Sequence, residues 1–480
     1  MGAGVSGWLL ANSVAKAGQL GVVSGTALDI ILVRRLQAGD PGEHMRRALA
    51  HFPIPEIANR IVEKYYIEGG KAATDSFKSC SMFSANPSIE LQELTVAANF
   101  VEVYLAKEGH NGVVGINYLE KIQMPNIYSI YGAMLAGVDY VLMGAGIPRE
   151  IPGILDRLSN HEEVSLSLNV DGADKEDDFR MFFDPKKVTG KELPVLKRPN
   201  FLAIIASDIL AITLAKKSTG KVDGFIIEGP IAGGHNAMPR GALKLSERGE
   251  PLYGPKDVVD IEKIKGLGLP FWLAGSYGTA EKLKEALNSG AAGVQVGTAF
   301  AFCKESGLTE EIRTALLDKV IKGTADVFTD PHASPTNFPF KVVRLEGTNS
   351  EADVFEARPR ICDLGYLRHL YKKEDGTVGY RCPSEPVEVY VKRGGSAEDT
   401  VGRKCLCNGL MANIGLPQLR KGYLEKPLVT AGEDLKYLGR FIKQGEKTYS
   451  AVDVINSMLE NKNAGASVPC SNDLTTEAGI

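Results

Sequence analysis

The chain has 480 residues, of which 44% are hydrophobic and 24% charged, ordinary values for a globular protein. Its 55 basic and 59 acidic residues leave a net charge of −4 without a long block of one sign, so the composition carries no nucleic-acid or membrane-surface footprint. No apolar run approaches the ~18 residues that a membrane-spanning helix needs. Seven dispersed cysteines, an odd number, favour reduced thiols and a cytoplasmic location over a disulfide framework.

Short β-branched runs alternate with helix-like segments along the chain, which is the pattern of a parallel α/β protein. The expected strands are residues 20–24, 112–117, 139–143, 164–170, 201–206, 223–227, 270–274 and 293–296. Most are followed by an amphipathic segment, and residues 279–288 give the clearest helix, with Gly290 just past its end. Eight such units predict a (β/α)8 TIM barrel.

The fourth of these runs does not fit a barrel. Residues 164–170 lead through an Asp-Gly turn into a second extended run at 179–183, so we expect an inserted antiparallel hairpin. Seven parallel strands then remain, and the chain begins in what has the pattern of the first strand-to-helix turn. We therefore expect the first barrel strand to lie upstream of Met1, with a truncated or misassigned start, and we expect open sheet edges beside the missing strand.

Two insertions and an extension account for the remaining length. Residues 34–110 hold few strand signals and are expected to be helical, and the hairpin belongs to a second insertion at 160–198. Beyond about residue 345 the sequence becomes rich in Arg, Cys, Gly and Pro. We assign residues 1–345 to the barrel and 346–480 to a C-terminal extension, mixed at first, then helical, with a disordered end.

The run Gly2-Ala3-Gly4-Val5-Ser6-Gly7 has the form G-x-G-x-x-G, which cradles a pyrophosphate in dinucleotide-binding folds. Such a site needs an acidic residue about 20 positions on. The next strand instead ends in Ser24-Gly25. A glycine turn against which the flat face of a cofactor lies fits the residues better, and a simple tight turn is the alternative.

A histidine follows paired glycines directly after an apolar strand, in the run Ile227-Glu228-Gly229-Pro230-Ile231-Ala232-Gly233-Gly234-His235. In a barrel this places His235 on a loop at the carboxyl ends of the strands, where active sites lie. Imidazole exchanges protons near neutral pH. Flanking glycines let backbone N–H groups approach a ring or an anion. We expect His235 to be a catalytic acid or base, with a structural histidine as the alternative.

Two later turns have the pattern of a phosphate site. Gly275-Ser276 ends one strand, and Gly297-Thr298 ends the next and opens a helix. Exposed backbone N–H groups and a helix N-terminus attract an anion. The loops after the seventh and eighth strands are a recurrent phosphate site of TIM barrels. Together the two turns predict a phosphate clamp.

In this order, the Ala-Gly-Gly-His loop, the Ala-Gly turn at 274–275 and the Gln-Val-Gly-Thr turn at 295–298 resemble nitronate monooxygenases, formerly called 2-nitropropane dioxygenases. The opening Met-Gly-Ala-Gly-Val-Ser is similar to the end of that family's first strand, and Gly115-Ile116-Asn117 to its Gly-Val-Asn at the third. Flavin-dependent enoyl-acyl-carrier-protein reductases share these features. The resemblance covers about residues 1–345 and implies a barrel that binds FMN.

The resemblance also implies roles for individual residues. Gly2 and Ala3 would contact the isoalloxazine ring, Asn117 would hydrogen-bond to it, and Gly233 and Gly234 would lie against it. The residues that would hold the phosphate are Gly275, Ser276, Gln295, Val296, Gly297 and Thr298.

Three positions depart from the family pattern. Glu228 stands where the family often has Gln, and its carboxylate could accept a hydrogen bond from flavin N3–H but could not donate one. Asn236 follows the histidine where Arg is frequent, and Ser276 replaces a second Gly. These departures concern the substrate more than the cofactor.

The activity implied is oxidation of alkyl nitronates by O2 to a carbonyl compound and nitrite. His235 would either pair as a cation with the nitronate or abstract a proton from a neutral nitroalkane. One alternative is an NAD(P)H-dependent enoyl-thioester reductase, and another is a flavin-binding subunit of a larger synthase. The expected partners are a small-molecule substrate and O2 or NAD(P)H, without nucleic acid or membrane, and a homo-oligomer is left open.

Two weaker signals lie outside these motifs. Cys362, Cys382, Cys405 and Cys407 have a spacing that is not typical of zinc or iron–sulfur sites, so free thiols and no metal are expected. The proline-rich segment 329–340 could wall the mouth of the active site, although a structural connection is the favoured interpretation.

Overall fold

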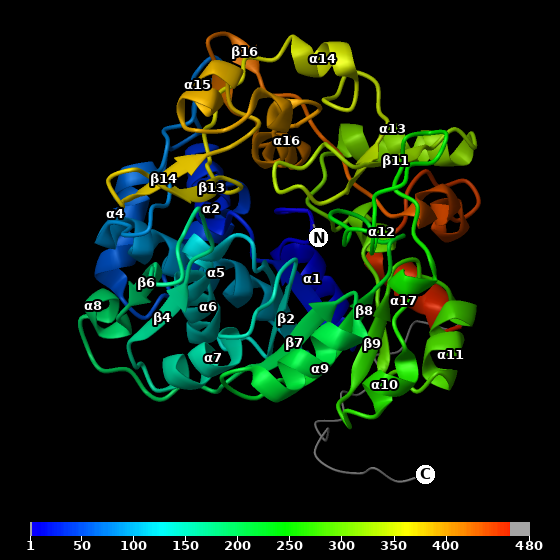
Figure 1. Cartoon of the computed structure of the whole chain (residues 1–480), viewed down its shortest axis with the longest axis horizontal. Helices are drawn as coiled ribbons and strands as arrows, with labels where there is room; N and C mark the ends of the chain where they lie inside the picture. The colour runs from blue at the N-terminus through cyan, green and yellow to red at the C-terminus, as the bar shows by residue number, and fades with distance from the viewer. Residues whose placement is uncertain (1, 461–480) are drawn as a thin grey trace.

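The sheet at the centre of the molecule is parallel throughout (Figure 1). The computed structural model describes residues 2–460. In sheet order its strands are β1 (Gly21–Ser24), β2 (Val114–Leu119), β3 (Tyr140–Gly144), β7 (Asn200–Ile205), β8 (Gly224–Glu228), β9 (Phe271–Ala274) and β10 (Gly293–Gln295). The seven predicted parallel strands are confirmed, and they form a curled TIM-barrel-like sheet. An eighth strand upstream of Met1 stays a prediction.

Helices between the strands cover the sheet, because strands buried on both faces need apolar cover. They are α1 (Trp8–Lys16), α6 (Gln123–Leu135), α7 (Ile151–Ser159), α9 (Asp208–Lys217), α10 (Ile261–Lys265) and α11 (Ala280–Asn288). The predicted helix α11 begins where the Thr279 hydroxyl accepts a hydrogen bond from the Lys282 N–H at 3.1 Å. It ends before Gly290, whose φ of 86° favours glycine.

Both predicted insertions have the expected structure. The first is helical, with α2 (Leu28–Gln37), η1 (Pro41–Glu43), α3 (His44–Leu49), α4 (Pro55–Tyr65) and α5 (Ile89–Lys107). In the second, β4 (Val164–Ser167) pairs antiparallel with β6 (Arg180–Phe183), so the hairpin is confirmed. The short helix α8 (Pro185–Thr189) follows it. The 3-10 turn η2 (Pro255–Asp257) lies farther along the chain, between β8 and α10.

The elements after β10 are short. They are α12 (Thr298–Ala301), α13 (Glu310–Ile321), β11 (Val327–Asp330), β12 (Phe340–Val343), α14 (Ala352–Glu356), β13 (His369–Lys372), β14 (Val378–Arg381), α15 (Val387–Lys392), η3 (Ala397–Thr400), α16 (Leu406–Asn413), β15 (Leu419–Arg420), β16 (Tyr423–Leu424), η4 (Glu433–Phe441) and α17 (Ala451–Met458). Short strands and helices alternate in the first part of this region, and the 3-10 helix η4 and the helix α17 follow at its end. The predicted disordered end falls on residues 461–480, outside the described residues.

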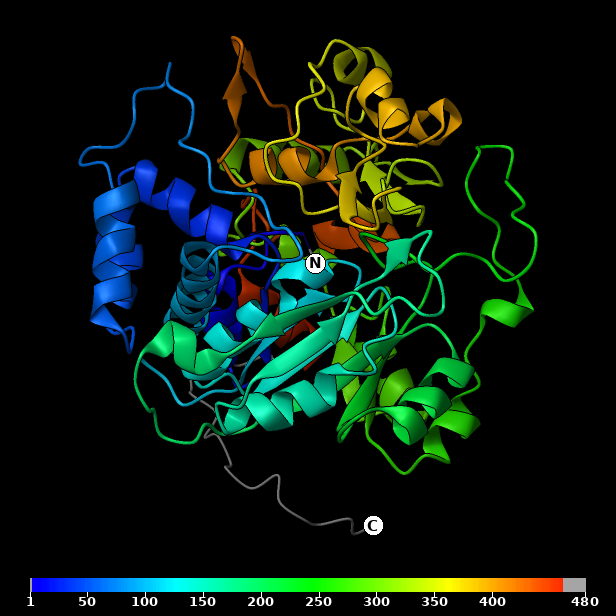
Figure 2. The ribbon, with the colours of Figure 1, turned by 60° about the vertical axis from the view of Figure 1, so that its left-hand side comes forward.

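The C-terminal elements cover the carboxyl rim of the sheet. Figure 2 shows them in yellow and orange above the cyan and green strands. Strand β13 pairs in parallel with β5 (Val170–Asp171) of the second insertion. Buried apolar residues of this part, such as Leu406 and Leu428, belong to the same core as the barrel strands. Within residues 2–460, no helix combines the length and the apolar composition that a membrane span requires.

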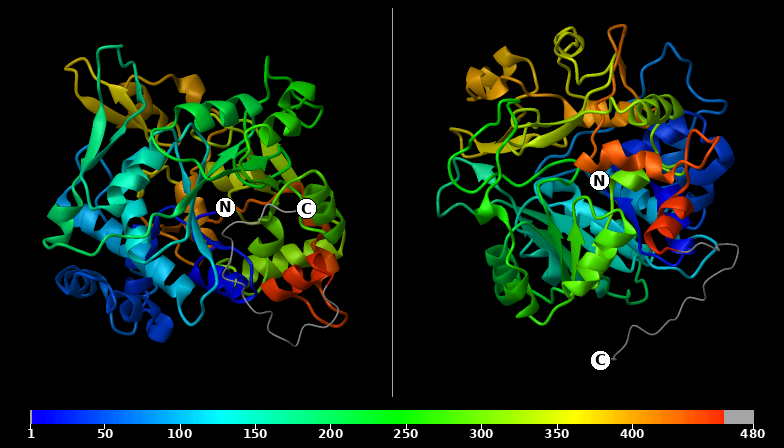
Figure 3. Two further views of the ribbon diagram at one scale, coloured as in Figure 1. Left: turned by 90° about the horizontal axis from the view of Figure 1, so that it is seen from below. Right: turned by 90° about the vertical axis from the view of Figure 1, so that its right-hand side faces the viewer.

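The start of the chain lies between the two edges of the sheet, β1 and β10. The carbonyl of Ser6 accepts a hydrogen bond from the Ser24 N–H at 2.8 Å, and that of Val5 accepts one from the Gly307 N–H at 2.8 Å. A Cβ at position 307 would lie 2.0 Å from the Gly4 carbonyl oxygen, so this approach requires glycine. Helix α17 packs against α1 and α11 on the outside (Figure 3, right).

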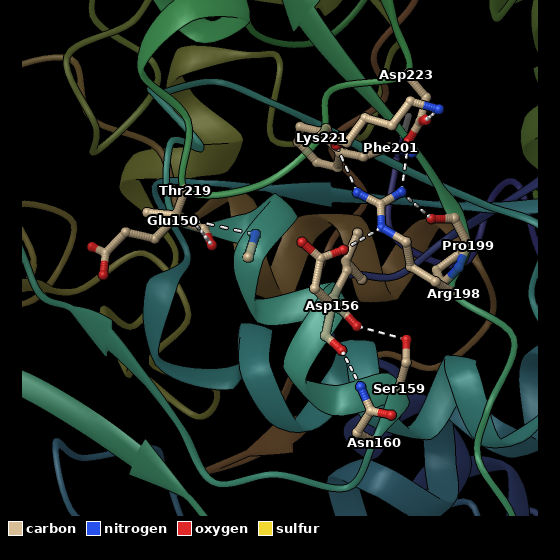
Figure 4. Close-up of polar contacts among 12 residues, drawn as sticks. Glu150, Asp156, Ser159, Asn160, Arg198, Pro199, Phe201, Thr219, Lys221 and Asp223 are labelled. Atoms are coloured by element: carbon tan, nitrogen blue, oxygen red, sulfur yellow. Dashed lines mark hydrogen bonds and ion pairs between the residues drawn. The ribbon is translucent and has the colours of Figure 1, made fainter.

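At the opposite, amino-terminal rim, Arg198 joins one helix to two strand-leading loops (Figure 4). Its guanidinium donates to Asp156 of α7 and to Asp223 before β8, each at 2.6 Å, and to the Lys221 carbonyl at 2.6 Å. Asp223 also accepts a hydrogen bond from the Phe201 N–H at 2.8 Å. In barrels this rim supports stability and the opposite rim carries function.

We therefore expect Arg198→Met to lower the free energy of unfolding by about 2 kcal/mol, because charge-assisted hydrogen bonds of a partly buried group are lost. The measurement is the urea midpoint. Arg157→Met is a matched control, since its ion pair with Glu162 is more than half exposed on the arginine side, and we expect less than about 1 kcal/mol there. Equal losses in the two variants would contradict the assignment.

Candidate functional site

One cavity opens at the carboxyl ends of the strands, and every residue that the sequence marks as a site residue lines it. These are Gly2, Ala3, Asn117, Glu228, Gly233, Gly234, His235, Gly275, Ser276, Gln295, Val296, Gly297 and Thr298. They come from the start of the chain, from the ends of β2, β8, β9 and β10, and from the loop after β8. The parallel strands bring them together because all their carboxyl ends meet at one rim.

The imidazole of His235 lies in the wall of this cavity. Its Nε2 atom is 2.7 Å from the hydroxyl of Ser334, and its ring packs edge-on against Phe340 with centroids 4.8 Å apart. Burial, together with the positive charge of Lys121, holds the pKa of His235 well below its usual value. The ring is therefore neutral at neutral pH and can accept a proton.

The loop that carries His235 is hydrogen-bonded on both flanks. The Asn236 N–H donates to the Pro339 carbonyl, and the Lys341 N–H donates to the Gly234 carbonyl, both at 2.9 Å. The Gly234 N–H donates to the Thr430 hydroxyl at 2.9 Å. The loop thus has one conformation, set by segments about 100 and 200 residues further along the chain.

Positions 233 and 234 favour glycine for different structural reasons. A Cβ at Gly233 would lie 2.7 Å from the backbone nitrogen of Gly432, so position 233 admits the backbone of a C-terminal segment. Gly234 has a φ of 82°, a left-handed conformation that favours glycine, and it has open space where a side chain would be. Gly233 therefore packs on protein backbone as well as lining the cavity.

The two late turns converge as predicted, with Gly275, Ser276, Gly297 and Thr298 in the same wall. Ser276 has a φ of 57°, which explains why a glycine is common at such a position. A carboxyl group also lies beside these turns, because the buried side chain of Asp434 hydrogen-bonds to Thr298. Burial raises the pKa of Asp434. The sequence analysis did not include this carboxyl group.

Polar atoms without partners face this region. Within the described residues, Asn117 Oδ1 and Ser276 Oγ are buried and have no hydrogen-bond partner. Buried polar groups are nearly always satisfied, so both atoms call for a polar ligand or water. Both belong to residues that line the cavity.

Two buried titratable groups lie in this region, Glu228 in the lining of the cavity and Lys121 in the lining of a second hollow. Burial raises the pKa of Glu228, at the end of β8, to about 7, against the opposing effect of Lys121. Burial lowers the pKa of Lys121, which follows β2, to about 7, against the effects of Glu228 and Glu120. Groups with such shifted pKa values in a cleft are typical of functional sites.

Sequence reasoning missed a whole wall of the cavity. Its apolar side chains come from the C-terminal part of the chain and include Leu364, Tyr366, Leu367, Leu406, Leu410 and Met411. The segment favoured as a structural connection, 329–340, also supplies Ser334 and Phe340 to His235. Its Thr-Asp-Pro-His-Ala-Ser-Pro run was the available signal, because rigid turns beside a barrel mouth often carry function.

The four late cysteines gather around one small hollow beside the cavity, and Cys407 lines both. Burial raises the pKa of each thiol, so the reactive thiolate is disfavoured. Among residues 2–460, no group of three or more His, Cys, Asp or Glu side chains is arranged to hold a metal ion.

The segment around His235 is similar in sequence to known proteins. Residues 194–330 match the family model named Nitronate monooxygenase. This stretch is the nitronate monooxygenase segment of the chain, named for the model that it matches. A nitronate monooxygenase of Pseudomonas aeruginosa is 36% identical over 94 residues, which are 20% of this chain and 25% of that protein. The alignment therefore spans a quarter of that relative.

Two solved structures are similar over most of the chain. FabK from Thermotoga maritima has a TM-score of 0.44 at 14% identity and covers 95% of this chain and 88% of its own. A nitroalkane oxidase from Streptomyces ansochromogenes has a TM-score of 0.44 at 14% identity and covers 96% of this chain and 93% of its own.

The nitronate monooxygenase segment contains β7 to β10, and with them Glu228, His235 and both late turns. Asn117 and the glycines at the start of the chain lie before it. The apolar wall, Ser334 and Asp434 lie after it. The resemblance expected from the sequence is thus confirmed for the part of the site that holds the histidine and the turns.

The neutral state of His235 can be measured directly. We expect the ring nitrogens of His235 to show no protonation step between about pH 6 and 8, whereas exposed histidines titrate there. Nitrogen-15 spectra of histidine-labelled protein, assigned with His235→Asn, report this. A pKa of His235 near the usual value would contradict the role of burial.

Proposed function

We propose that this chain is an FMN-dependent oxidoreductase that oxidises alkyl nitronates with O2 to a carbonyl compound and nitrite. The observation that carries the proposal is the meeting of His235, the glycine-lined turns and Asn117 in one cavity, within and beside a nitronate monooxygenase segment. The proposal implies that the substrate is a small molecule, that electrons pass through the flavin and that O2 is the second substrate.

The residues present fit a flavin. The unpartnered Asn117 Oδ1 and Ser276 Oγ can each hydrogen-bond to a polar ligand, and Gly234 and Gly297 leave open space where a side chain would stand. Gly2 and Ala3 would support the ring, while Gly275, Ser276 and residues 295–298 would hold the phosphate. Asp434 is the one unfavourable group beside an anion, and its raised pKa favours its neutral form.

A bound flavin would supply the electron acceptor and the reaction with O2, so the protein must bind, orient and manage protons. His235 is neutral, which favours abstraction of a proton over ion pairing with a nitronate. Its Nε2 atom contacts Ser334, so the proton would be taken up at Nδ1. The apolar wall at Leu406 and Met411 would bind the alkyl part of the substrate and exclude water.

The same apolar wall would also suit the acyl chain of an enoyl thioester. For that reason the NAD(P)H-dependent reductase is retained as the second candidate, with His235 protonating the substrate. Oxygen uptake with an alkyl nitronate and without NAD(P)H supports the proposal. Rapid flavin bleaching by NADH with turnover of a crotonyl thioester supports the second candidate. Bound flavin without either turnover supports a subunit of a larger synthase.

Charge at the two late turns should set the affinity for FMN. We expect Gly297→Asp to weaken FMN binding about tenfold or more, because it adds a carboxylate beside the phosphate. We expect Asp434→Asn to strengthen binding at a pH above the pKa of Asp434, where the unaltered protein carries a carboxylate at that position. Flavin fluorescence quenching measures both. Gly254→Asp is a matched control, since that exposed glycine also leaves open space for a side chain. Unchanged affinity in both turn variants would place the phosphate elsewhere.

Loss of the histidine should separate two substrates. We expect His235→Asn to lower kcat/KM for a neutral nitroalkane by about 10²- to 10⁴-fold, the usual contribution of a general base. The preformed nitronate needs no proton abstraction, so its oxidation should fall much less. Oxygen-electrode assays with both substrates provide the comparison, and the visible spectrum checks that flavin is still bound. Equal losses on both substrates would contradict the base role.

A further inference from the structure

A line of side chains leads from the histidine away from the cavity. His235 Nε2 lies 2.7 Å from Ser334 Oγ, and Ser334 Oγ lies 2.8 Å from Thr336 Oγ1. Lys121 Nζ lies 3.4 Å from Thr336 Oγ1. From this geometry we propose that Lys121 is a positioning residue that exchanges protons with His235 through Thr336 and Ser334. The inference rests on the function proposed above and extends it.

The two hydroxyls are held in place by the C-terminal part of the chain. Ser334 is fully buried, and its carbonyl accepts a hydrogen bond from Arg403 at 2.6 Å. Arg403 also donates to the carbonyl of His332 at 3.0 Å and to the side chain of Asn337. The Thr336 N–H donates to Ser334 Oγ at 3.2 Å. The buried Ser334 hydroxyl and the half-buried Thr336 hydroxyl are therefore hydrogen-bond partners.

Lys121 is placed so that it can be neutral or charged near pH 7. Its ammonium lies over the ring of Phe338, 4.4 Å from the centroid, and burial lowers its pKa to about 7. The charged groups that act on it are Glu228 from β8 and its neighbour Glu120. A lysine with a pKa near the working pH can serve as a proton acceptor.

Lys121 and Thr336 also line a second hollow, beside the main cavity. The polar and charged residues that line it with them are Gln123, Asn169, Asp171, Arg368 and His369. A hollow with such a polar lining has room and partners for water. Lys121 can therefore return its proton to water without opening the main cavity.

The proposed relay moves protons in one direction, from the substrate through His235 to Lys121. Nδ1 of His235 takes the proton from the α-carbon of a neutral nitroalkane, whose C–H electron pair stays on the nitronate. The Nε2 proton then passes to Ser334, the Ser334 proton to Thr336, and the Thr336 proton to the free amine of Lys121. His235 ends neutral, and the positive charge rests on Lys121. The relay therefore needs Lys121 uncharged at the start.

This requirement predicts the direction in which turnover changes with pH. Lys121 is neutral above its pKa of about 7, so turnover of a neutral nitroalkane should rise with pH through that value. We expect Lys121→Met and Thr336→Val each to lower kcat about 10- to 100-fold above this pKa and to abolish the rise of kcat with pH, because the Nε2 proton of His235 then has no acceptor. Lys322→Met, at an exposed lysine, is the matched control and should match the unaltered protein.

The variant Lys121→Arg distinguishes a proton-relay role of Lys121 from a role that needs only its positive charge. Arginine keeps the positive charge and the donor but cannot accept a proton near pH 7, so we expect it to be as slow as Lys121→Met. Full activity of Lys121→Arg, or of Thr336→Val, would overturn the inference. The visible spectrum of each variant shows whether flavin is bound, so loss of the cofactor is not mistaken for loss of the relay.

A readout without turnover keeps the inference distinct from the proposed activity. Nitrogen-15 shifts of His235 should change as Lys121 titrates near its pKa, without a full protonation step. We expect this change to vanish in Lys121→Met and to shrink in Thr336→Val. If neither nitronate nor nitroalkane is oxidised and the shifts still respond, the proposed function fails and the coupling stands. Shifts that ignore pH near 7 in the unaltered protein would overturn the coupling itself.

Discussion

The site depends on the hydrogen bonds that fix the loop before and after His235. The backbone of Gly234 and Asn236 is tied to residues 339–341 and to Thr430, so the imidazole has its position only when these distant segments are in place. A loop at a strand end is otherwise free to move. Folding of the C-terminal part and formation of the cavity are therefore parts of one event.

Burial then determines the protonation states in the cavity. It lowers the pKa of Lys121 and raises that of Glu228 until both are about 7, and the same burial keeps His235 neutral. Each group alone would be costly to bury in its charged form. A proton can therefore move from one of these groups to another near neutral pH without a change in their total charge. Such transfer suits the proton abstraction proposed for His235.

The sequence predicted what local pattern determines. Short β-branched runs that alternate with helix-like segments predicted the seven strands. The turns at 233–235, 275–276 and 297–298 could be assigned because a barrel brings strand ends to one rim. Ser334 was beyond reach, because its contact with His235 spans 99 residues and leaves no periodic signal. Asp434 was missed for the same reason, since only the fold brings it to Thr298.

The departures from the family pattern have structural roles, and this bears on what the family match can imply. Asn236 donates through its side chain to the Ala232 carbonyl at 2.9 Å and so stabilises the histidine loop from within. The positive charge of Lys121 lowers the pKa of Glu228 and so opposes the effect of burial. The matched segment ends at residue 330, whereas the apolar wall and the partners of His235 lie beyond it. The family match therefore bears on the side of the cavity proposed for the cofactor, whereas the apolar wall proposed for the substrate comes from residues after the matched segment.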